Sequence, residues 1–299
     1  MAEKNSPIAL GFIGLGVMGE PMCSNLVRKS GNTVHIFDLQ AEPVQRLGQL
    51  GATVCSSIQE VAREAEIVFL SLPGIAQVEQ VCLGSNSLSD AGGRVRIIVD
   101  MSTSDVSRTR ALAEKLRAHG ITLVDAPVAR MRQAARDGTL LIAVGAGKKD
   151  FDEITPFLQC MGTDIVHCGG SGNGQVVKIM NNMVVFMTVH ALAEAITIGR
   201  AAGMDGAALL DALSKGSANS FVLQNPGLKS LATDTFPEKT FPTEYAIKDI
   251  SLALELAKAG GVEARSAGLT HTLLTQTRDA GYVKEYYPIM VRLIEKGYH

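Results

Sequence analysis

The chain has 299 residues, of which 46% are hydrophobic and 19% are charged, and its formal net charge is −2. This length suits about two domains, and the hydrophobic content supplies a large core and argues against disorder. The sequence contains neither a basic run nor an acidic tail, so nucleic acid is not an expected partner. The N-terminal segment MAEKNSP is polar and has no apolar signal-peptide region.

The five cysteines are scattered and form no CxxC pair. We therefore expect no disulfide framework and no zinc site, and we expect a cytoplasmic location. Cys168, beside a Gly-rich loop, is open to two interpretations: a nucleophile, or the buried hydrophobe that a free cysteine usually is. The most apolar long segment, 179–202, contains asparagines, a histidine and a glutamate. It therefore indicates a buried helix and no membrane span.

The first half of the chain alternates short β-branched runs with helical patterns. Strands are expected at 8–13, 33–37, 67–70, 96–99 and 122–124, and helices at 18–29, 42–50 and 106–118. Repeated alternation of this kind predicts a doubly wound parallel sheet with helices on both faces. Two further runs, 140–144 and 164–167, are candidates to extend the same sheet.

At Gly169 the pattern changes to apolar residues at helical spacing. Further helices are expected at 206–214, 249–259, 268–280 and 286–295, and strand signals nearly disappear. We predict an α/β fold made of three parts. They are an α/β domain over 1–170, a long interdomain helix over 171–202, and an all-helical domain over 203–299.

A GxGxxG motif joins the first expected strand to the first helix. Its residues are Gly14, Leu15, Gly16, Val17, Met18 and Gly19. Glycines let the backbone approach a pyrophosphate, and the helix N-terminus supplies free N–H groups and a positive dipole end. Asp38, at the end of the second expected strand, can accept both adenosine ribose hydroxyls and would repel the extra phosphate of NADP. We predict NAD as the cofactor, against the alternative of a glycine turn beside a surface aspartate.

Two further loops follow expected strands at the sheet edge where ligands usually bind. Leu72 and Pro73 follow the strand at 67–70, and Ser102 and Thr103 follow the strand at 96–99. Cofactor contacts are one interpretation of these loops. An ordinary turn and a helix N-cap are the other.

The segment GGSGNGQVVKIMNN, 169–182, runs from a Gly-rich loop into the long apolar helix. Lys178 lies near the start of this helix, and Asn182 lies one turn later on the same face. Because burying an ammonium is costly, Lys178 can persist as a neutral amine with a lowered pKa, which a general base needs near pH 7. Asn182 can hold that amine by a hydrogen bond. The alternative is a lysine that extends from a core helix to solvent.

Together these motifs resemble the β-hydroxyacid dehydrogenase family, which includes 3-hydroxyisobutyrate dehydrogenase and tartronate semialdehyde reductase. The resemblance covers nearly the whole chain. Its motifs, in order, are GFIGLGVMGEPM at 11–22, LP at 72–73, DMST at 100–103, DAPV at 125–128, GTL at 138–140, GxxGxGxxxKxxxN at 169–182, KD at 248–249 and LA at 252–253.

The resemblance implies an NAD-dependent oxidoreductase that transfers hydride between nicotinamide and a small β-hydroxyacid, or its semialdehyde, without a metal. It implies that Lys178 is the acid/base and that Asn182 orients the substrate or the lysine. Ser102 or Thr103 would contact cofactor or substrate, and Lys248 would reach the nicotinamide. Gly172 and Phe241 are further substrate-binding candidates, although Phe241 is equally open to being a core residue. The resemblance also implies that the domain over 1–170 is an NAD-binding Rossmann domain and that the helical domain over 203–299 serves substrate binding and oligomerisation. The implied assembly is a homodimer or homotetramer.

One departure from the family concerns the residues after DAPV, which are commonly Ser-Gly-Gly but here are Ala129-Arg130-Met131. Arg130 offers a fork of donors suited to a carboxylate, sulfonate or phosphate, and sulfolactaldehyde reductase carries a similar arginine. An alternative function is therefore sulfolactaldehyde reductase, or dehydrogenase of a β-hydroxy amino acid of the D-threonine or serine type. The other interpretation of Arg130 is a residue that points to solvent.

Three other classes share the overall plan. Phosphosugar decarboxylating dehydrogenases typically have longer chains with a larger helical domain than this chain offers. Imine reductases typically lack a lysine at the position of Lys178. A non-catalytic module would be expected to lose the lysine or the glycines, and both are present here.

Overall fold

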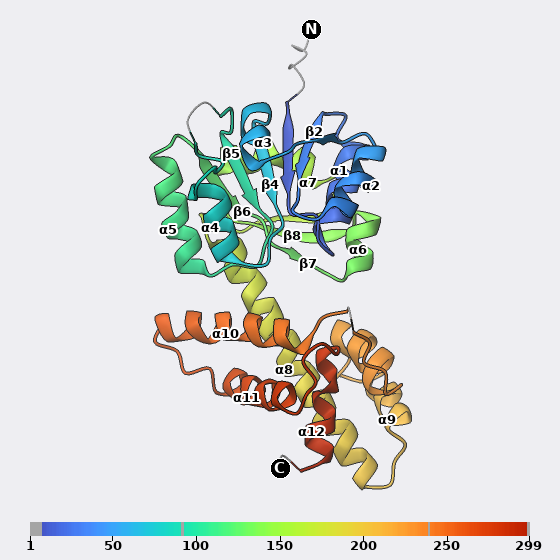
Figure 1. The fold of residues 1–299 in the computed structure, drawn as a ribbon. Coiled ribbons are helices and arrows are strands. Elements are labelled where there is room, and N and C mark those ends of the chain that lie inside the picture. Colours follow the sequence, from blue (N-terminus) through green and yellow to red (C-terminus); the bar gives the residue numbers. More distant parts are fainter. Residues whose placement is uncertain (1–7, 91–92, 239, 298–299) are drawn as a thin grey trace. The chain divides into compact units, whose positions relative to one another are not determined.

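The computed structural model describes residues 8–90, 93–238 and 240–297 (Figure 1). The polar N-terminal segment 1–7, for which no signal-peptide region was expected, lies outside the described residues. The chain divides into two compact units, Met1–Lys178 and Ile179–His299.

The first unit is built on a six-stranded sheet of order β3-β2-β1-β4-β5-β6, in which every neighbouring pair is parallel. Its strands are β1 (Leu10–Ile13), β2 (Val34–Phe37), β3 (Thr53–Val54), β4 (Ile67–Leu70), β5 (Ile97–Asp100) and β6 (Thr122–Asp125). This confirms the predicted doubly wound sheet. Strand order reverses between β1 and β4, and ligands of such sheets bind beyond the strand carboxyl ends at that point.

Helices cover both faces of this sheet (Figure 1). One apolar core includes residues of α1 (Gly19–Lys29), α2 (Ala41–Gln49), α6 (Arg132–Asp137) and α7 (Lys148–Leu158). The other includes residues of α3 (Ile58–Glu64), α4 (Ile75–Leu83) and α5 (Val106–Arg117). The strands β1, β4 and β5 are buried along their whole length. Apart from Asp100 at the end of β5, their sequences are therefore continuous apolar runs and not alternating ones.

The expectation that 140–144 and 164–167 extend the parallel sheet is wrong. These residues belong to a separate three-stranded sheet of β7 (Val128–Ala129), β8 (Leu140–Val144) and β9 (Gly162–His167). Pro127 follows β6 closely and has no N–H to continue a ladder, and β8 pairs with β7 in antiparallel fashion. An antiparallel bridge between Asp125 and Gly145 connects β6 to the end of β8.

Helices also make up the second unit. The helix α8 (Asn173–Ala201) enters it, and the helices that follow are α9 (Gly206–Leu213), η1 (Leu223–Leu231), α10 (Thr243–Ala259), α11 (Arg265–Asp279), η2 (Tyr287–Met290) and α12 (Val291–Glu295). Within its described part, strand pairing is limited to one bridge between Pro242 and Tyr286. The all-helical character is thus confirmed.

Prolines explain where the helices of this unit depart from the expected ones. The helix expected at 249–259 begins earlier, directly after Pro242, which stands at its N-cap. Residues 286–295 form a 3-10 turn and then a short α-helix, and Pro288 lies in the first turn of that 3-10 segment. The unexpected π-helix η1 contains Pro226, whose missing N–H cannot make a normal helical bond.

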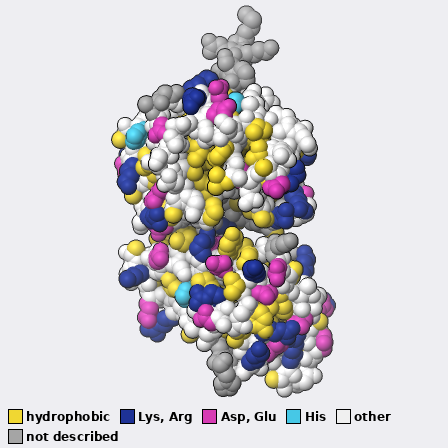
Figure 2. All heavy atoms as spheres, viewed as in Figure 1, with side chains coloured by type: hydrophobic (Ala, Val, Ile, Leu, Met, Phe, Trp, Pro, Cys, Tyr) yellow, Lys and Arg dark blue, Asp and Glu magenta, His cyan; other side chains and the backbone are white. Residues whose placement is uncertain are grey.

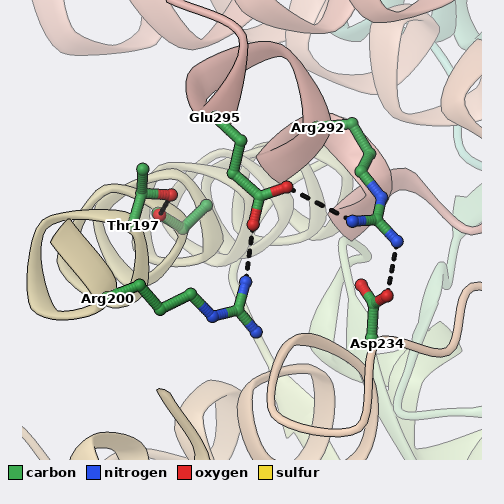
Figure 3. Close-up of polar contacts among 6 residues, drawn as sticks. Thr197, Arg200, Asp234, Arg292 and Glu295 are labelled. Atoms are coloured by element: carbon green, nitrogen blue, oxygen red, sulfur yellow. Dashed lines mark hydrogen bonds and ion pairs between the residues drawn. The ribbon is translucent and has the colours of Figure 1, made fainter. Parts of the chain in front are cut away.

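The apolar core of the second unit includes Phe186, Val189 and Ile196 of α8. A chain of ion pairs joins the end of this helix to α12 (Figure 3). Glu295 accepts from Arg200 at 2.5 Å and from Arg292 at 3.3 Å. Arg292 in turn pairs with Asp234. Because these side chains are partly exposed, the pairs add only modest stability.

Charges of both signs are interspersed on the displayed face of each unit (Figure 2). Among the described residues, α8 alone is long and apolar enough to cross a membrane by length and composition. A core helix passes the same test, and α8 contributes buried side chains to the core of the second unit.

Candidate functional site

The GxGxxG loop lies between β1 and α1, and its three glycines have separate roles. Gly14 has a φ of +94°, which suits glycine, and a Cβ there would overlap the carbonyl oxygen of Ser71. A Cβ on Gly19 would overlap the carbonyl oxygen of Gly14, whereas a Cβ on Gly16 would meet no atom within 4 Å. Two glycines therefore permit the tight turn, and Gly16 leaves the backbone open to a ligand.

Asp38 lies against this loop. Its Oδ2 accepts a hydrogen bond from the Leu15 N–H at 2.5 Å, and its Oδ1 accepts one from the Gln40 N–H at 2.7 Å. Each carboxylate oxygen has further acceptor capacity for a hydroxyl. Among the described residues, no side chain caps the start of α1. The open backbone, the uncapped helix N-terminus and the carboxylate fit a dinucleotide.

The two other ligand-edge loops are joined by Ser102. Its Oγ accepts from the Leu72 N–H at 2.9 Å, and its own N–H donates to Asp100 Oδ1 at 2.9 Å. Ser102 is buried and Thr103 is partly buried, whereas Pro73 is exposed. The structure therefore brings Leu72 and Ser102 together at the carboxyl edge of the sheet.

Two buried carboxylates, which we did not single out from the sequence, hold this edge together. Asp125 Oδ1 accepts from the Gly172 N–H at 2.6 Å, and its Oδ2 accepts from the Gln175 N–H at 2.9 Å. Burial raises the pKa of Asp125, while the hydrogen bonds from Gly172 and Gln175 act in the opposite direction. The signal available in the sequence was an aspartate that ends an apolar strand, in DAPV as in DMST.

Asp100 is the second of these acids. It accepts from the Ser102 N–H and, at 3.0 Å, from the Ser104 hydroxyl. The pKa of Asp100 is raised to about 6. Burial is the main cause and the nearby Asp125 charge acts in the same direction, whereas the hydrogen bonds from Ser102 and Ser104 lower the pKa. The group is fully buried, so its ionised form depends on these two donors.

Lys178 lies in the second turn of α8 and is the last residue of the first unit. Its side chain is half-buried, while the neighbouring Val177 is exposed. The Gly-rich loop before it includes Gly172, which has a φ of +84° and is buried. Burial raises the pKa of Cys168, which favours the thiol over a nucleophilic thiolate.

In the second unit, Asn182 and Lys248 share one partner. The Asn182 side-chain amide donates to Asp249 Oδ2 at 2.6 Å, and Lys248 Nζ lies 3.1 Å from Asp249 Oδ1. Asp249 is buried and was noted in the sequence only as part of the Lys-Asp pair. This carboxylate fixes the orientation of the Asn182 amide.

Phe241 lies in an aromatic cluster of the same unit. Its ring centroid is 6.0 Å from those of Phe186 and Tyr287 and 6.2 Å from that of Tyr245. The side chain is partly buried. These contacts describe a packed and partly buried phenylalanine.

Arg130 is held by the second sheet of its unit. Its Nη2 lies 2.7 Å from Asp164 Oδ2, and its Nη1 donates to the Thr139 carbonyl at 2.6 Å and to Thr163 Oγ1 at 3.2 Å. The backbone of Arg130 has a φ of +86°. This conformation costs a residue with a side chain about 1–3 kcal/mol.

Comparison with known proteins shows which family the chain belongs to. The family model described as the NAD-binding domain of 6-phosphogluconate dehydrogenase matches residues 9–170. The model described as the NAD-binding domain of NADP-dependent 3-hydroxyisobutyrate dehydrogenase matches residues 172–294. This chain belongs to the β-hydroxyacid dehydrogenase family.

Relatives of this β-hydroxyacid dehydrogenase match along most of their length. It is 35% identical to 2-(hydroxymethyl)glutarate dehydrogenase of Eubacterium barkeri, over 97% of this chain and 95% of that one. It is 36% identical to 3-hydroxyisobutyrate dehydrogenase of Pseudomonas aeruginosa, over 84% and 85%. A solved structure of Mycobacterium tuberculosis 3-hydroxyisobutyrate dehydrogenase with L-serine is 27% identical, with a TM-score of 0.85 over 97% and 99%.

The β-hydroxyacid dehydrogenase described here is therefore an oxidoreductase that uses a nicotinamide cofactor. Its glycine loop and Asp38 provide the features that such a cofactor needs. Within residues 8–90, 93–238 and 240–297, no cluster of histidine, cysteine and acidic side chains is arranged to hold a metal ion.

Two glycine substitutions test the separate roles in the loop. Gly19→Ala places a methyl group against the Gly14 carbonyl, so we expect a loss of about 1–3 kcal/mol in unfolding free energy, as for an overpacked site. Gly16→Ala meets open space, so it should change the unfolding free energy by less than about 0.5 kcal/mol. It should nevertheless weaken NADH binding, because the methyl group keeps the pyrophosphate away from the backbone.

Urea unfolding and NADH fluorescence titration measure these two effects. Equal stability of the Gly19→Ala variant and the wild type would contradict the packing argument. Unchanged NADH affinity of Gly16→Ala would contradict the expected approach of the pyrophosphate to the backbone of this loop.

The raised pKa of Asp100 predicts how stability depends on pH. The folded state holds the Asp100 proton up to about pH 6, whereas the unfolded state releases it near pH 4. The contribution of this group to the free energy of unfolding is therefore full below pH 4 and is lost as pH rises through 6. Asp100→Asn keeps an acceptor for Ser102 and removes the titration. We expect its unfolding free energy, relative to wild type, to rise by up to about 3 kcal/mol between pH 4 and 7.

Chemical denaturation at several pH values measures this difference. A difference between variant and wild type that stays constant from pH 4 to 7 would contradict the assigned role of Asp100.

Proposed function

We propose that the protein is an NAD-dependent oxidoreductase of the 3-hydroxyisobutyrate dehydrogenase type, with Lys178 as acid/base. Its substrate is a small β-hydroxyacid or the corresponding semialdehyde. The observation that carries the proposal is the placement of Lys178 on α8. This helix begins at a turn whose amides are bound by Asp125, and Asp125 ends a strand at the ligand edge of the sheet.

Proton transfer is the step assigned to the protein. When bound, the nicotinamide ring accepts or supplies the hydride. In the oxidative direction the neutral Lys178 amine takes the proton of the substrate hydroxyl, and in the reductive direction the ammonium returns a proton to the oxygen. Positioned proton transfer of this kind typically contributes a factor of about 10² to 10⁴. Asn182 is proposed to orient the substrate or the amine, and Asp249 holds its amide in one direction.

The cofactor contacts are proposed residue by residue. The backbone from Gly14 to Gly19 receives the pyrophosphate, and Asp38 accepts the ribose hydroxyls. Leu72, Pro73, Ser102 and Thr103 border the cofactor at the sheet edge, and Lys248 serves its nicotinamide end. NAD is favoured over NADP because the Asp38 carboxylate would repel a 2′-phosphate, and the next two residues, Leu39 and Gln40, offer no arginine to hold that phosphate.

Substrate contacts are proposed for Ser102, Gly172 and Phe241 in addition to Lys178 and Asn182. The N–H of Gly172 is donated to Asp125. Gly172 is therefore proposed to act through its backbone shape. The Ser102 hydroxyl accepts from the Leu72 N–H and has a second lone pair that can accept from a ligand.

Arg130 carries the alternative function. Backbone strain of the kind seen at Arg130 is typical of ligand clamps, and a relative is named for 2-(hydroxymethyl)glutarate, which has two carboxylates. In this alternative the Arg130 guanidinium releases Asp164 and binds a second anionic group of the substrate, or the anionic group of a zwitterionic substrate. A sulfolactaldehyde or a β-hydroxy amino acid of the threonine or serine type would then be the substrate.

Assembly and location complete the proposal. The family resemblance supports a homodimer or homotetramer, and the cysteines of the described chain are free thiols, as in a reducing cytoplasm. Small molecules are the proposed partners.

Lys178→Ala tests the mechanism. We expect the turnover number to fall at least about 10²-fold, because the proton acceptor is removed, while the dissociation constant for NADH changes less than about threefold. Steady-state rates and NADH fluorescence measure the two quantities. A fall of less than about tenfold, with NADH still bound, would remove Lys178 from the mechanism.

A substrate panel with both cofactors tests the specificity. We expect NADH formation from a β-hydroxyacid, with kcat/KM at least about tenfold higher for NAD than for NADP. Activity confined to sulfonates or β-hydroxy amino acids would favour the alternative that involves Arg130. Equal use of NADP would contradict the role given to Asp38.

A further inference from the structure

Gln175 connects the start of α8 to the loop that follows β5. Its side-chain Nε2 donates to the Ser102 carbonyl at 2.8 Å, and its Oε1 accepts from the Ser104 N–H at 3.0 Å. The side chain is fully buried. Gln175 lies one helical turn before Lys178, so the same residue touches the ligand-edge loop and fixes the helix that carries the amine.

Each end of the Gln175 carboxamide has one fixed hydrogen-bond role. The donor end faces a carbonyl and the acceptor end faces an N–H, so an apolar side chain would leave two buried backbone groups unpaired. The backbone N–H of Gln175 is itself bound by Asp125 Oδ2. Gln175 therefore has three directed bonds, to Ser102, Ser104 and Asp125.

A carboxylate at this position would be poorly tolerated. It would direct an oxygen at the Ser102 carbonyl and would stand among bonds to two buried acids, Asp100 and Asp125. A protonated carboxyl, by contrast, has one O–H donor and one carbonyl acceptor, which is the pattern that Ser102 and Ser104 require.

We propose that Gln175 is a positioning residue for the reaction: its buried carboxamide holds the Ser102–Ser104 loop and the Lys178 turn of α8 in register. This inference rests on the proposed function of Lys178. Gln175 touches neither substrate nor cofactor in this role. Its loss acts through displacement of Lys178 relative to Ser102, and small displacements of reacting groups can reduce turnover by about 10².

Gln175→Leu tests the proposal directly. We expect kcat to fall about 10- to 100-fold. The NADH dissociation constant should change by a clearly smaller factor, because the Gly14–Gly19 loop and Asp38 are untouched and only the contacts of Ser102 and Thr103 are affected. The chain contains no tryptophan, so NADH fluorescence can be followed without protein indole emission. Gln159→Leu, at an exposed glutamine that ends α7, is the matched control and should leave both quantities unchanged.

Gln175→Glu provides a test that a merely structural role would not satisfy, and it still applies if Gln175→Leu does not fold. At low pH the introduced carboxyl is protonated and reproduces the donor and the acceptor, so kcat should approach that of wild type. As pH rises, the ionised group loses the donor, and kcat relative to wild type should fall about tenfold or more.

Three results would overturn the proposal. They are a kcat within twofold of wild type for folded Gln175→Leu, NADH affinity and kcat that fall in parallel, and a ratio of Gln175→Glu to wild-type kcat that does not depend on pH. Full turnover by Lys178→Ala would instead contradict the proposed function. Loss of turnover by Lys178→Ala together with any of these three results would reject only the role of Gln175.

Discussion

The first unit depends on the contact between the Asp125 carboxylate and the amides at the start of α8. A helix N-terminus leaves several N–H groups without partners, and here a side chain from a distant strand binds those of Gly172 and Gln175. The negative charge also suits the positive end of the helix dipole. Because Asp125 ends β6, the bonds transmit the position of the sheet edge to the first turn of the helix.

Close packing makes this contact possible. Gly172 has a positive φ, and a Cβ on Gly174 would overlap the Ala143 carbonyl and lie 2.8 Å from Asp125 Oδ2. The glycines of the Gly-rich segment therefore let the helix start approach β6 and β8. Their role differs from that of Gly16, which leaves open backbone after the inner strand β1.

Structural features that depend on residues close together in the chain were predicted well from the sequence. The βα alternation predicted β1, β2, β4, β5 and β6, and the GxGxxG spacing predicted the turn that brings Leu15 to Asp38. The separate sheet was missed because strand periodicity does not specify a pairing partner. It depends on Pro127 after β6 and on the pairing of β8 with β7.

Buried polar partners were harder to predict than the residues they support. Lys178 and Asn182 stand out as polar groups in an apolar helix, but Asp249 and Gln175 stand out only when their contacts are known. A single aspartate that follows a strand is common at turns and N-caps. Long-range pairing over 50 or 67 residues, as for Asp125 with Gln175 and Asp249 with Asn182, has no periodic signal in the chain.

Arg130 shows how such a partner changes the interpretation of a substitution. From the sequence, an arginine in place of glycine suggested either a ligand contact or a solvent-facing side chain. The structure adds Asp164, Thr139 and Thr163, which offset the strain of a positive φ by charge-assisted bonds. Since the pair is about half exposed, its net contribution is modest. Arg130 is therefore a residue with structural partners in its own unit, and its contact with an anionic substrate stays a prediction.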